Sequence, residues 1–352
     1  MSASEKPRRT TLQDIAERTG FTVNTVSRAL KDKSDISLAT REHIKAIADE
    51  MGYVRNRAAS SLRSGRTKTI GVIVGGMSNP YYGIMTDAIQ NAATELGYSI
   101  LIFCSRDEVE TELHAVETAL SYQVDGILLF PCAESARTIQ RLKAVGIPYV
   151  LMARHLDREE DDYVVCDDEQ GGYLAARHLI DAGHTRLGFL SSFNVVYSSE
   201  LRLRGFFRAL EEAGIPKENG LTACRLGRAE SRLQVDFWRR IGVTGMFVFC
   251  DEEAWRVISY LQAQGLSIPR DMSIVGFDNI QGSLPIPAPI CSIEYDISGM
   301  AKNGINLLRN RIHQSDLAPQ HIVYPPHLIC RGSCGTSSLP IGFSQDYDSY
   351  FR

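Results

Sequence analysis

The sequence predicts a small all-α helix-turn-helix head joined to an α/β body of two doubly wound, parallel-sheet lobes. Three observations predict this organisation in the 352-residue chain. The first fifty residues carry three capped helical segments, the rest alternates buried apolar runs with amphipathic stretches, and that alternation runs twice, with a break near 152–168. Buried strands that alternate with helices are typical of parallel sheets covered on both faces. A chain of this length is also too long for one ordinary core.

The head is predicted to hold three short helices, each with its own start signal. Thr11 precedes the first, with Asp14 three residues on as in a capping box, and Gly20 ends it. Thr22 begins a second helix over residues 23–30, and Ser37 begins a third. One face of the third helix is apolar at helical spacing: Ile44, Ile47, Ala48 and Met51.

A helix, a glycine turn and a second helix within residues 12–30 have the spacing of a DNA-binding helix-turn-helix. The second helix of that motif lies in the major groove, where its leading side chains reach base edges. Asn can pair with adenine, Arg with guanine, and Val can contact a thymine methyl. The candidate recognition residues are Thr22, Val23, Asn24, Thr25, Ser27 and Arg28. On spacing alone, a small helical bundle without a ligand is the alternative.

Charge is distributed unevenly along the chain. Residues 1–66 carry thirteen Lys or Arg against eight Asp or Glu, whereas residues 67–352 carry 25 against 34. A basic head on an acidic body indicates that only the head meets a polyanion. The chain has no stretch of about 18 apolar residues and no secretion signal at its start, so we expect a cytoplasmic protein with no membrane contact.

In the body, apolar runs predict strands and the stretches between them predict helices. Predicted strands are 70–74, 100–103, 126–130, 149–151, 187–190, 223–226, 246–249, 273–277 and a last pair within 321–331. Predicted helices include 81–97, 169–182, 199–214, 252–265 and 296–313.

Two other classes of protein stay open as alternatives. A two-lobed enzyme is disfavoured, because the chain has no Gly-rich phosphate loop, nucleophile elbow or metal-ligand spacing. A transport binding protein is disfavoured by the head and by the missing secretion signal. Among eight cysteines only Cys330 and Cys334 are close, and no His or Cys pair completes a zinc set. We therefore expect reduced structural thiols, no metal and no cofactor.

The motifs resemble the LacI/GalR family of bacterial repressors, and the similarity covers nearly all of residues 10–335. In the head it lies in the segments 11–16 (TLQDIA), 25–30 (TVSRAL), 52–53 (GY) and 56–62. In the body it lies in 79–82 (NPYY), 124–127 (VDGI), 202–206 (RLRGF) and 275–279 (VGFDN).

The resemblance implies a domain organisation. Residues 1–53 would form the DNA-binding domain, 54–68 a hinge helix and linker, 69–335 a periplasmic-binding-protein-like body, and 336–352 a tail. Within the body the expected first lobe is 69–152 with 296–323, and the expected second lobe is 163–292 with 325–335.

The resemblance also implies a hinge that binds the minor groove. Hinge helices of the family fold on DNA, and a paired leucine enters a central base step; Leu62 is the matching residue. An apolar wedge of this kind unstacks a step and bends the duplex. The candidate hinge residues are Tyr53, Asn56, Arg57, Ala59 and Leu62. Proline is frequent in the family where Arg55 stands, and arginine where Ser60 stands.

For the body, the resemblance implies a small ligand between the lobes. Tyr81 and Tyr82 would supply aromatic walls, and Arg202 and Asp278 polar anchors. Asp251 opens a helix after a strand, so it either lines the pocket or caps that helix.

Three positions depart from patterns known in the family. Cys250 stands where asparagine is usual, Ala153 where aspartate is frequent, and Val196 where a purine-binding relative has arginine. These departures leave the identity of the effector open, and the pocket could be empty.

We therefore predict a homodimeric, non-enzymatic transcription repressor. Each recognition helix would bind one half-site of a pseudo-palindromic operator in double-stranded DNA. A sugar or related metabolite would set the operator affinity, as inducer or co-repressor. The alternative is an effector-independent regulator with a vestigial pocket.

Overall fold

The computed structural model describes residues 10–54, 65–156, 158–191, 196–224, 226, 228–284 and 289–335. Contacts divide the chain into two compact units, Met1–Thr67 and Lys68–Arg352, called here the head and the body. Among the described residues, no helix combines the length and apolar character needed to cross a membrane.

The head holds the three predicted helices: α1 (Leu12–Thr19), α2 (Val23–Ala29) and α3 (Leu38–Glu50). Their caps form as the sequence predicts. Thr11 and Asp14 make a reciprocal capping box, and Gly20 ends α1 with a φ of 74°, a left-handed conformation that suits glycine. The second helix ends one residue earlier than predicted. The head core consists of Ile15, Ala16, Val26, Ala29, Ile44 and Ala48.

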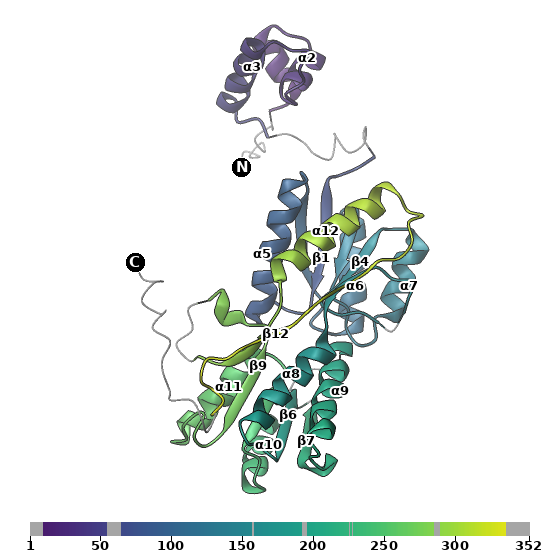
Figure 1. The fold of residues 1–352 in the computed structure, drawn as a ribbon. Helices are drawn as coiled ribbons and strands as arrows, with labels where there is room; N and C mark the ends of the chain where they lie inside the picture. The colour runs from purple at the N-terminus through teal and green to yellow at the C-terminus, as the bar shows by residue number, and fades with distance from the viewer. Residues whose placement is uncertain are drawn as a thin grey trace, which may run out of the picture. The chain divides into compact units, whose positions relative to one another are not determined.

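The first lobe is built on a six-stranded sheet in the order β11-β5-β4-β3-β1-β2, in which every pair is parallel. Its strands are β1 (Thr69–Val74), β2 (Ser99–Cys104), β3 (Gly126–Leu129), β4 (Tyr149–Met152), β5 (Tyr163–Cys166) and β11 (His321–Tyr324). Helices α5 (Pro80–Glu95) and α12 (Ile297–His313) pack together on one face, and α6 (Val109–Ser121) and α7 (Ala136–Val145) on the other (Figure 1).

The second lobe repeats this architecture in the order β12-β10-β9-β8-β6-β7, with only the β10–β12 pair antiparallel. Its strands are β6 (Leu187–Ser191), β7 (Gly220–Cys224), β8 (Gly245–Val248), β9 (Ser273–Phe277), β10 (Cys291–Glu294) and β12 (His327–Ile329). Its helices are α8 (Asp168–Asp181), α9 (Tyr197–Glu212), α10 (Arg228–Arg240), α11 (Asp251–Ala263) and the short 3₁₀ turns η1 (Lys217–Asn219) and η2 (Ile280–Gly282).

Helices α8 and α9 cross unusually closely, side by side in Figure 1. A Cβ added to Gly172 would lie 2.0 Å from the carbonyl oxygen of Arg202, and one added to Gly205 would lie 1.8 Å from that of Glu169. Only glycine permits backbones to approach so closely. This crossing fixes the position of Arg202 relative to the start of α8.

The lobe boundary differs from the predicted one. Strand β5 pairs with β4 and β11 of the first sheet, so the segment expected to open the second lobe at residue 163 belongs to the first. A parallel pair is usually joined through a helix, and 153–162 holds none, which made this loop resemble a break between lobes. The chain crosses between the sheets at 166–168, 294–297 and 324–327.

Candidate functional site

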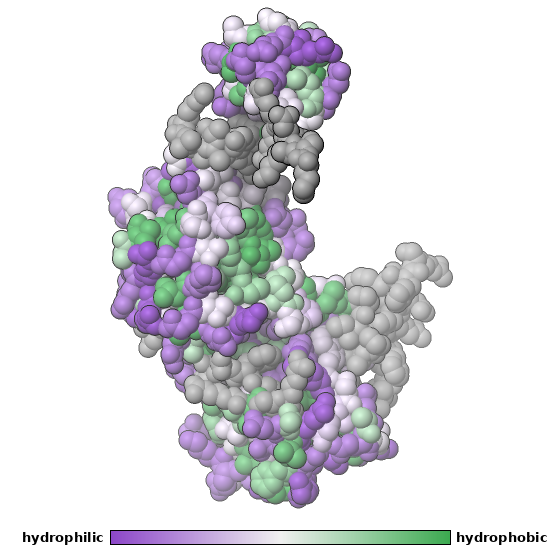
Figure 2. Space-filling model, turned by 180° about the vertical axis from the view of Figure 1, so that it is seen from behind, coloured by the Kyte–Doolittle hydropathy of each residue, from purple (hydrophilic) through white to green (hydrophobic). Residues whose placement is uncertain are grey.

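The leading end of α2 presents the residues predicted to meet base edges. Thr22 caps the helix, accepting a hydrogen bond from the Thr25 backbone N–H at 3.2 Å. Val23 is 38% exposed and Asn24 is exposed, whereas Val26 on the opposite side is fully buried in the head core. Val23 and Asn24 are therefore accessible to a partner. Figure 2 shows a mostly hydrophilic face of the head.

Arg28 occupies the last turn of α2 and forms an ion pair with Asp35. The Arg28 hydrogen bond and charge lower the pKa of the Asp35 carboxyl. Both side chains are nearly half exposed, at 46% and 48%. Exposed pairs of this kind contribute little to the stability of a fold, so a base or phosphate can displace Asp35 at little cost.

Of the predicted hinge residues, only Tyr53 lies within the described part of the chain. It is half-buried against the head core, and its backbone N–H donates to the Ala48 carbonyl at 2.9 Å. Tyr53 therefore belongs to the packed head. The other four hinge candidates lie outside the described residues: Asn56, Arg57, Ala59 and Leu62.

A cavity of about 30 Å³ lies between the two lobes of the body. It is bounded by residues that follow the carboxyl ends of strands, where ligands bind in open α/β sheets. Four of the five predicted effector residues line it: Tyr81, Tyr82, Arg202 and Asp278. Cys166 and Tyr295, on two of the segments that cross between the lobes, line it as well. A movement of one lobe against the other therefore changes the shape of the cavity.

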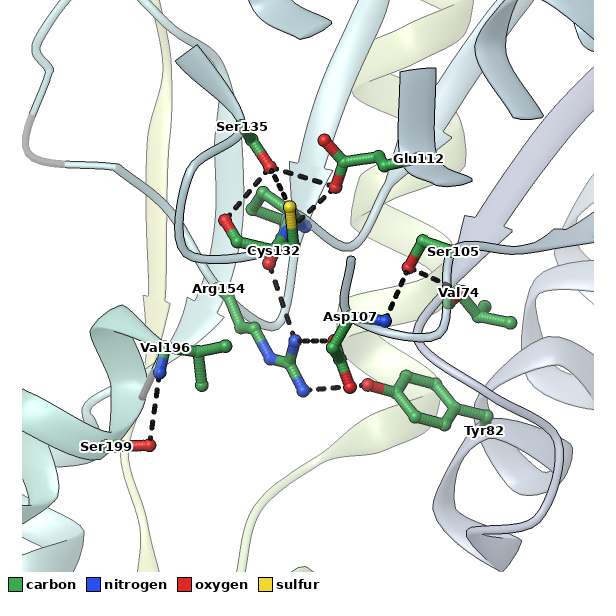
Figure 3. A network of polar contacts seen from close by, with 11 residues as sticks. Val74, Tyr82, Ser105, Asp107, Glu112, Cys132, Ser135, Arg154, Val196 and Ser199 are labelled. Atoms are coloured by element: carbon green, nitrogen blue, oxygen red, sulfur yellow. Dashed lines mark hydrogen bonds and ion pairs between the residues drawn. The ribbon is translucent and has the colours of Figure 1, made fainter. Parts of the chain in front are cut away.

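Arg154 forms the polar centre of the first-lobe wall (Figure 3). Its Nη1 donates to Oδ1 of Asp107 at 2.6 Å, and its Nη2 donates to the Tyr82 hydroxyl at 2.8 Å. Burial acts to lower the pKa of Arg154, but its electrostatic interactions with Tyr82 and with the Asp107 carboxylate outweigh burial and raise that pKa. The guanidinium therefore stays charged inside the cleft.

The loop behind Arg154 is held by a buried carboxylate. Oε2 of Glu112 accepts hydrogen bonds from the Cys132 backbone N–H at 2.8 Å and from the Ser135 hydroxyl at 2.9 Å (Figure 3). This fixes the Pro131 carbonyl, which accepts from Nη1 of Arg154 at 3.4 Å. The first-lobe wall is thus organised around its own ion pair.

Arg202 forms the polar centre of the second-lobe wall. Its Nε donates to Oδ1 of Asp168 at 2.7 Å, and its Nη1 donates to the Phe249 carbonyl at 2.6 Å. The guanidinium also lies over the Phe277 ring, 3.4 Å from its centroid. Cation–π contacts are strengthened by such burial, so the arginine is locked in one orientation. Both Arg202 and Asp168 are nearly fully buried, which excludes a surface ion pair.

Asp278 follows β9 in a left-handed conformation, with a φ of 96°. Such a conformation is strained for a residue with a side chain and clusters at functional sites. Its carboxylate accepts a hydrogen bond from the Tyr295 hydroxyl at 3.0 Å. Burial raises its pKa to about 6, although the charge of Arg202 acts to lower it. Asp278 is therefore an acceptor that titrates near neutral pH.

Tyr81 contributes a hydroxyl to the cavity wall. Its hydroxyl is buried and has no hydrogen-bond partner among the described residues. The Tyr81 and Tyr82 rings meet edge to face, with centroids 5.3 Å apart. Because an unpartnered buried hydroxyl is costly, this atom is a natural contact for a ligand or water.

Asp251 does not line the cavity, which corrects one of the predicted effector residues. Its carboxylate is fully buried and accepts from the Ser292 hydroxyl at 2.7 Å and the Ile280 backbone N–H at 2.9 Å. It joins α11 to the loop after β9. Cys250, which caps α11, is buried and does not line the cavity either. The departure from asparagine at that position therefore does not alter the described wall.

Sequence reasoning missed the partners that organise the cleft. Arg154 follows β4 and Asp107 follows β2, and position after a strand was the available signal for both. Ala153 and Arg154 both line the cavity, and the carboxylate of Asp107 lies behind them, paired with Arg154.

Comparisons with known proteins bear on both units of the chain. Residues 11–56 match the family described as bacterial regulatory proteins, lacI family, and residues 176–334 match the periplasmic binding protein-like domain. The transcriptional regulator DegA of Bacillus subtilis is 31% identical over 335 residues, which cover 92% of this chain and 98% of DegA.

Two solved structures share the fold. The complex of the transcriptional regulator CelR with cellobiose is 27% identical, with a TM-score of 0.67, covering 92% of this chain and all of that one. The lac repressor dimer bound to operator has a TM-score of 0.79, covering 93% of this chain and all of that one at 24% identity, and it supports the fold alone. The helix-turn-helix head, the two-lobed body and the identity to DegA together place the chain in the LacI family of bacterial transcriptional regulators.

Proposed function

We infer that this regulator represses transcription by binding a pseudo-palindromic operator as a homodimer, and that a small polar molecule between its lobes sets its operator affinity. Two features support the proposal. The head exposes the leading residues of α2, and the body encloses a cavity with polar and aromatic groups from both lobes.

The side chains that line the cleft support binding of a small polar ligand. Arg202 and Asp278 face the cavity from the second lobe and the tyrosine pair from the first, and the Tyr81 hydroxyl lacks a partner among the described residues. Aromatic faces stack on ring ligands, while a carboxylate and a guanidinium bind hydroxyls and ring heteroatoms. A sugar or related ring metabolite fits this set. The cellobiose bound to CelR supports the same chemical class.

The dimer follows from the size of the head. A single three-helix head makes few contacts with DNA, whereas two heads joined through their bodies gain from the high effective concentration of the second. Two recognition helices related by a two-fold axis fit an operator of matching symmetry.

We attribute the coupling between the ligand cleft and the DNA-binding head to the segments that cross between the two lobes. Cys166 and Tyr295 line the cavity at two crossings, and the Asp167 backbone N–H donates to the Tyr324 carbonyl at 2.9 Å, joining the first crossing to the third. A ligand that favours one lobe angle therefore acts on all three. A coupling free energy of about 1–3 kcal/mol would change operator affinity by about 5–150-fold.

One observation favours the alternative, an effector-independent regulator. A cavity of about 30 Å³ has room for roughly one water molecule. Arg154 and Asp107 already satisfy each other there. If the regulator depends on an effector, the ligand binds when the lobes are further apart. If it does not, the Arg154–Asp107 ion pair permanently replaces a ligand.

Two measurements separate these proposals. Selection of duplexes by the purified full-length protein should enrich a two-fold symmetric sequence. Thermal-shift screening with sugars, nucleosides and nucleobases should find a compound that raises the melting temperature and changes affinity for that operator. If the protein selects an operator but no compound changes its affinity, the result supports the effector-independent alternative. No sequence preference over random duplex at moderate salt contradicts both.

A further inference from the structure

A cluster of metal-binding side chains lies in the second lobe, away from the ligand cleft. His178, Cys291 and Cys330 each direct a ligand atom to one place, and these atoms lie within 4.8 Å of one another. They come from α8, from the start of β10 and from the segment after β12. The expectation that no His or Cys pair completes a zinc set rested on spacing along the sequence, whereas these three residues meet in space.

We propose that His178, Cys291 and Cys330 bind a thiophilic divalent cation of the zinc class. Zinc is held in proteins by cysteine sulfur and histidine nitrogen in tetrahedral geometry. Cys334 lies beside the same histidine, with its sulfur 4.0 Å from the His178 carbonyl oxygen, so a third thiol lies near the three clustered side chains.

The separation of the two sulfur atoms fits a metal better than a disulfide. Sγ of Cys291 and Sγ of Cys330 are 3.5 Å apart. Two thiolates on one tetrahedral zinc, each at about 2.3 Å, lie roughly 3.8 Å apart. A disulfide instead requires a separation of about 2.05 Å. The observed distance is close to the edge of a zinc tetrahedron.

The histidine supplies an independent observation. Nε2 of His178 is buried and makes no hydrogen bond of good geometry among the described residues, and the imidazole interacts with the thiols of Cys291 and Cys334. A buried imidazole nitrogen without a well-formed hydrogen bond is costly, and metal coordination satisfies it. This nitrogen and the facing thiols therefore point to the same occupant.

Hydrogen bonds from the surrounding backbone fix the position of Cys291, as is common for cysteine ligands of metals. The Arg331 backbone N–H donates to Sγ of Cys291 at 3.3 Å, and the Cys291 backbone N–H donates to the Ser333 hydroxyl at 2.7 Å. Such outer contacts orient thiolate ligands and tune their affinity. Ser333 in turn donates to the Ile274 carbonyl at 2.6 Å, so the segment after β12 is fixed to β9.

The ion would cross-link three elements that are distant in sequence: α8, β10 and the segment that carries Cys330. Both α8 and β10 lead toward the ligand cleft at their other ends, through Asp168 and Tyr295. Since Cys330 is exposed, the ion can exchange with solution. A bound ion would stabilise the second lobe. The stability of that lobe would then depend on the metal concentration and not on the effector.

Cobalt binding to the full-length protein tests this proposal. The protein is stripped with a chelator, kept reduced with a phosphine that does not bind zinc, and titrated with Co²⁺. We expect one equivalent per chain, with the visible absorption of tetrahedral cobalt and a thiolate charge-transfer band, both displaced by Zn²⁺. Zinc should also raise the melting temperature of the protein.

Variants decide which residues hold the ion. Cys330→Ser should weaken Co²⁺ binding by at least about tenfold and remove part of the thiolate band. His178→Asn should shift the cobalt spectrum. The matched control is Cys104→Ser, because Cys104 is also an exposed thiol but lies on β2 of the first lobe. It should bind the ion like the wild type.

Three results would overturn the proposal. The first is the absence of any ion after dialysis against a weak competing chelator. The second is Co²⁺ binding that Cys330→Ser leaves unchanged. The third is a disulfide between Cys291 and Cys330 found by peptide mass spectrometry in protein isolated without reductant, which would make the cluster a redox pair.

Discussion

Arg154 and Asp107 are 47 residues apart in sequence, yet the Nη1 atom of the arginine lies 2.6 Å from Oδ1 of the aspartate. The pair joins the ends of β4 and β2, and the Tyr82 hydroxyl closes it on the cavity side. Both side chains are largely buried, with exposed fractions of 13% and 19%. The predictions for the body depend on whether this pair holds the cleft or yields to a ligand.

Replacing Arg154 by glutamine should lower the free energy of unfolding of the body by about 2–3 kcal/mol, because Asp107 is left as a buried charge without its cation. Asp107→Asn in the same chain should restore part of this loss. Urea denaturation of the full-length protein measures both effects. The control is Arg141→Gln, which breaks the exposed pair with Glu117 and should leave the free energy of unfolding nearly unchanged. Equal losses at the two sites would show that the cleft pair has no special role.

Replacing Asp278 by alanine should abolish the response to the effector while leaving operator binding in place. The carboxylate lines the cavity and accepts a hydrogen bond from Tyr295, and it lies in the body, not the head. Gel shift with and without the effector measures the response. The control is Asp251→Asn, which changes a buried carboxylate that does not line the cavity. A normal response in Asp278→Ala would place the effector elsewhere.

Asp278 should also make stability depend on pH. Its pKa in the folded protein is about 6, above the ordinary value of 3.8, so the folded state binds more protons than the unfolded chain between these limits. Stability then falls as pH rises through this window, by about 3 kcal/mol in total. The difference in unfolding free energy between wild type and Asp278→Asn, measured from pH 4 to 7, should show that slope. Asp87→Asn, at an exposed site on α5, should not alter it.

Replacing Arg28 by alanine should relax base preference at one position in each half-site, at a cost of about 1–3 kcal/mol. Asp35→Ala is the matched control, since it removes the ion-pair partner and leaves the guanidinium free. The Asp35→Ala variant should bind the operator as tightly as the wild type or more tightly. Competition binding with single-base variants of the operator measures both. A uniform loss over all sequences would assign Arg28 to a phosphate contact.

Replacing Leu62 by alanine should weaken operator binding strongly and leave effector binding unchanged. The expectation rests on the sequence, because Leu62 lies outside the described residues. An apolar wedge lost from the minor groove removes both the bend and the contacts that the bend permits. Fluorescence anisotropy with a labelled operator measures the change, and Leu233→Ala, at an exposed leucine on α10 of the body, serves as control. Unchanged affinity would count against the wedge.

Much of the fold followed from local signals. Thr11 with Asp14, Thr22 and Ser37 cap the three head helices as predicted, because capping is decided within four residues. Strand and helix alternation gave the two lobes for a similar reason. Strands β5 and β10 were not predicted. The pairing of β5 depends on segments far along the chain, and the loop before it has no helix.

The sequence by itself determined the helix-turn-helix and the alternating body, because periodicity and caps are local properties. Its resemblance to the LacI/GalR family implied four residues that line the cavity. Only the tertiary structure decided which charges meet. It paired Arg154 with Asp107 and Arg202 with Asp168, took Asp251 away from the cavity, and brought His178 to Cys291 and Cys330. Ion pairs and ligand sets depend on distances of a few ångströms between residues tens to more than a hundred positions apart, and no local pattern contains those distances.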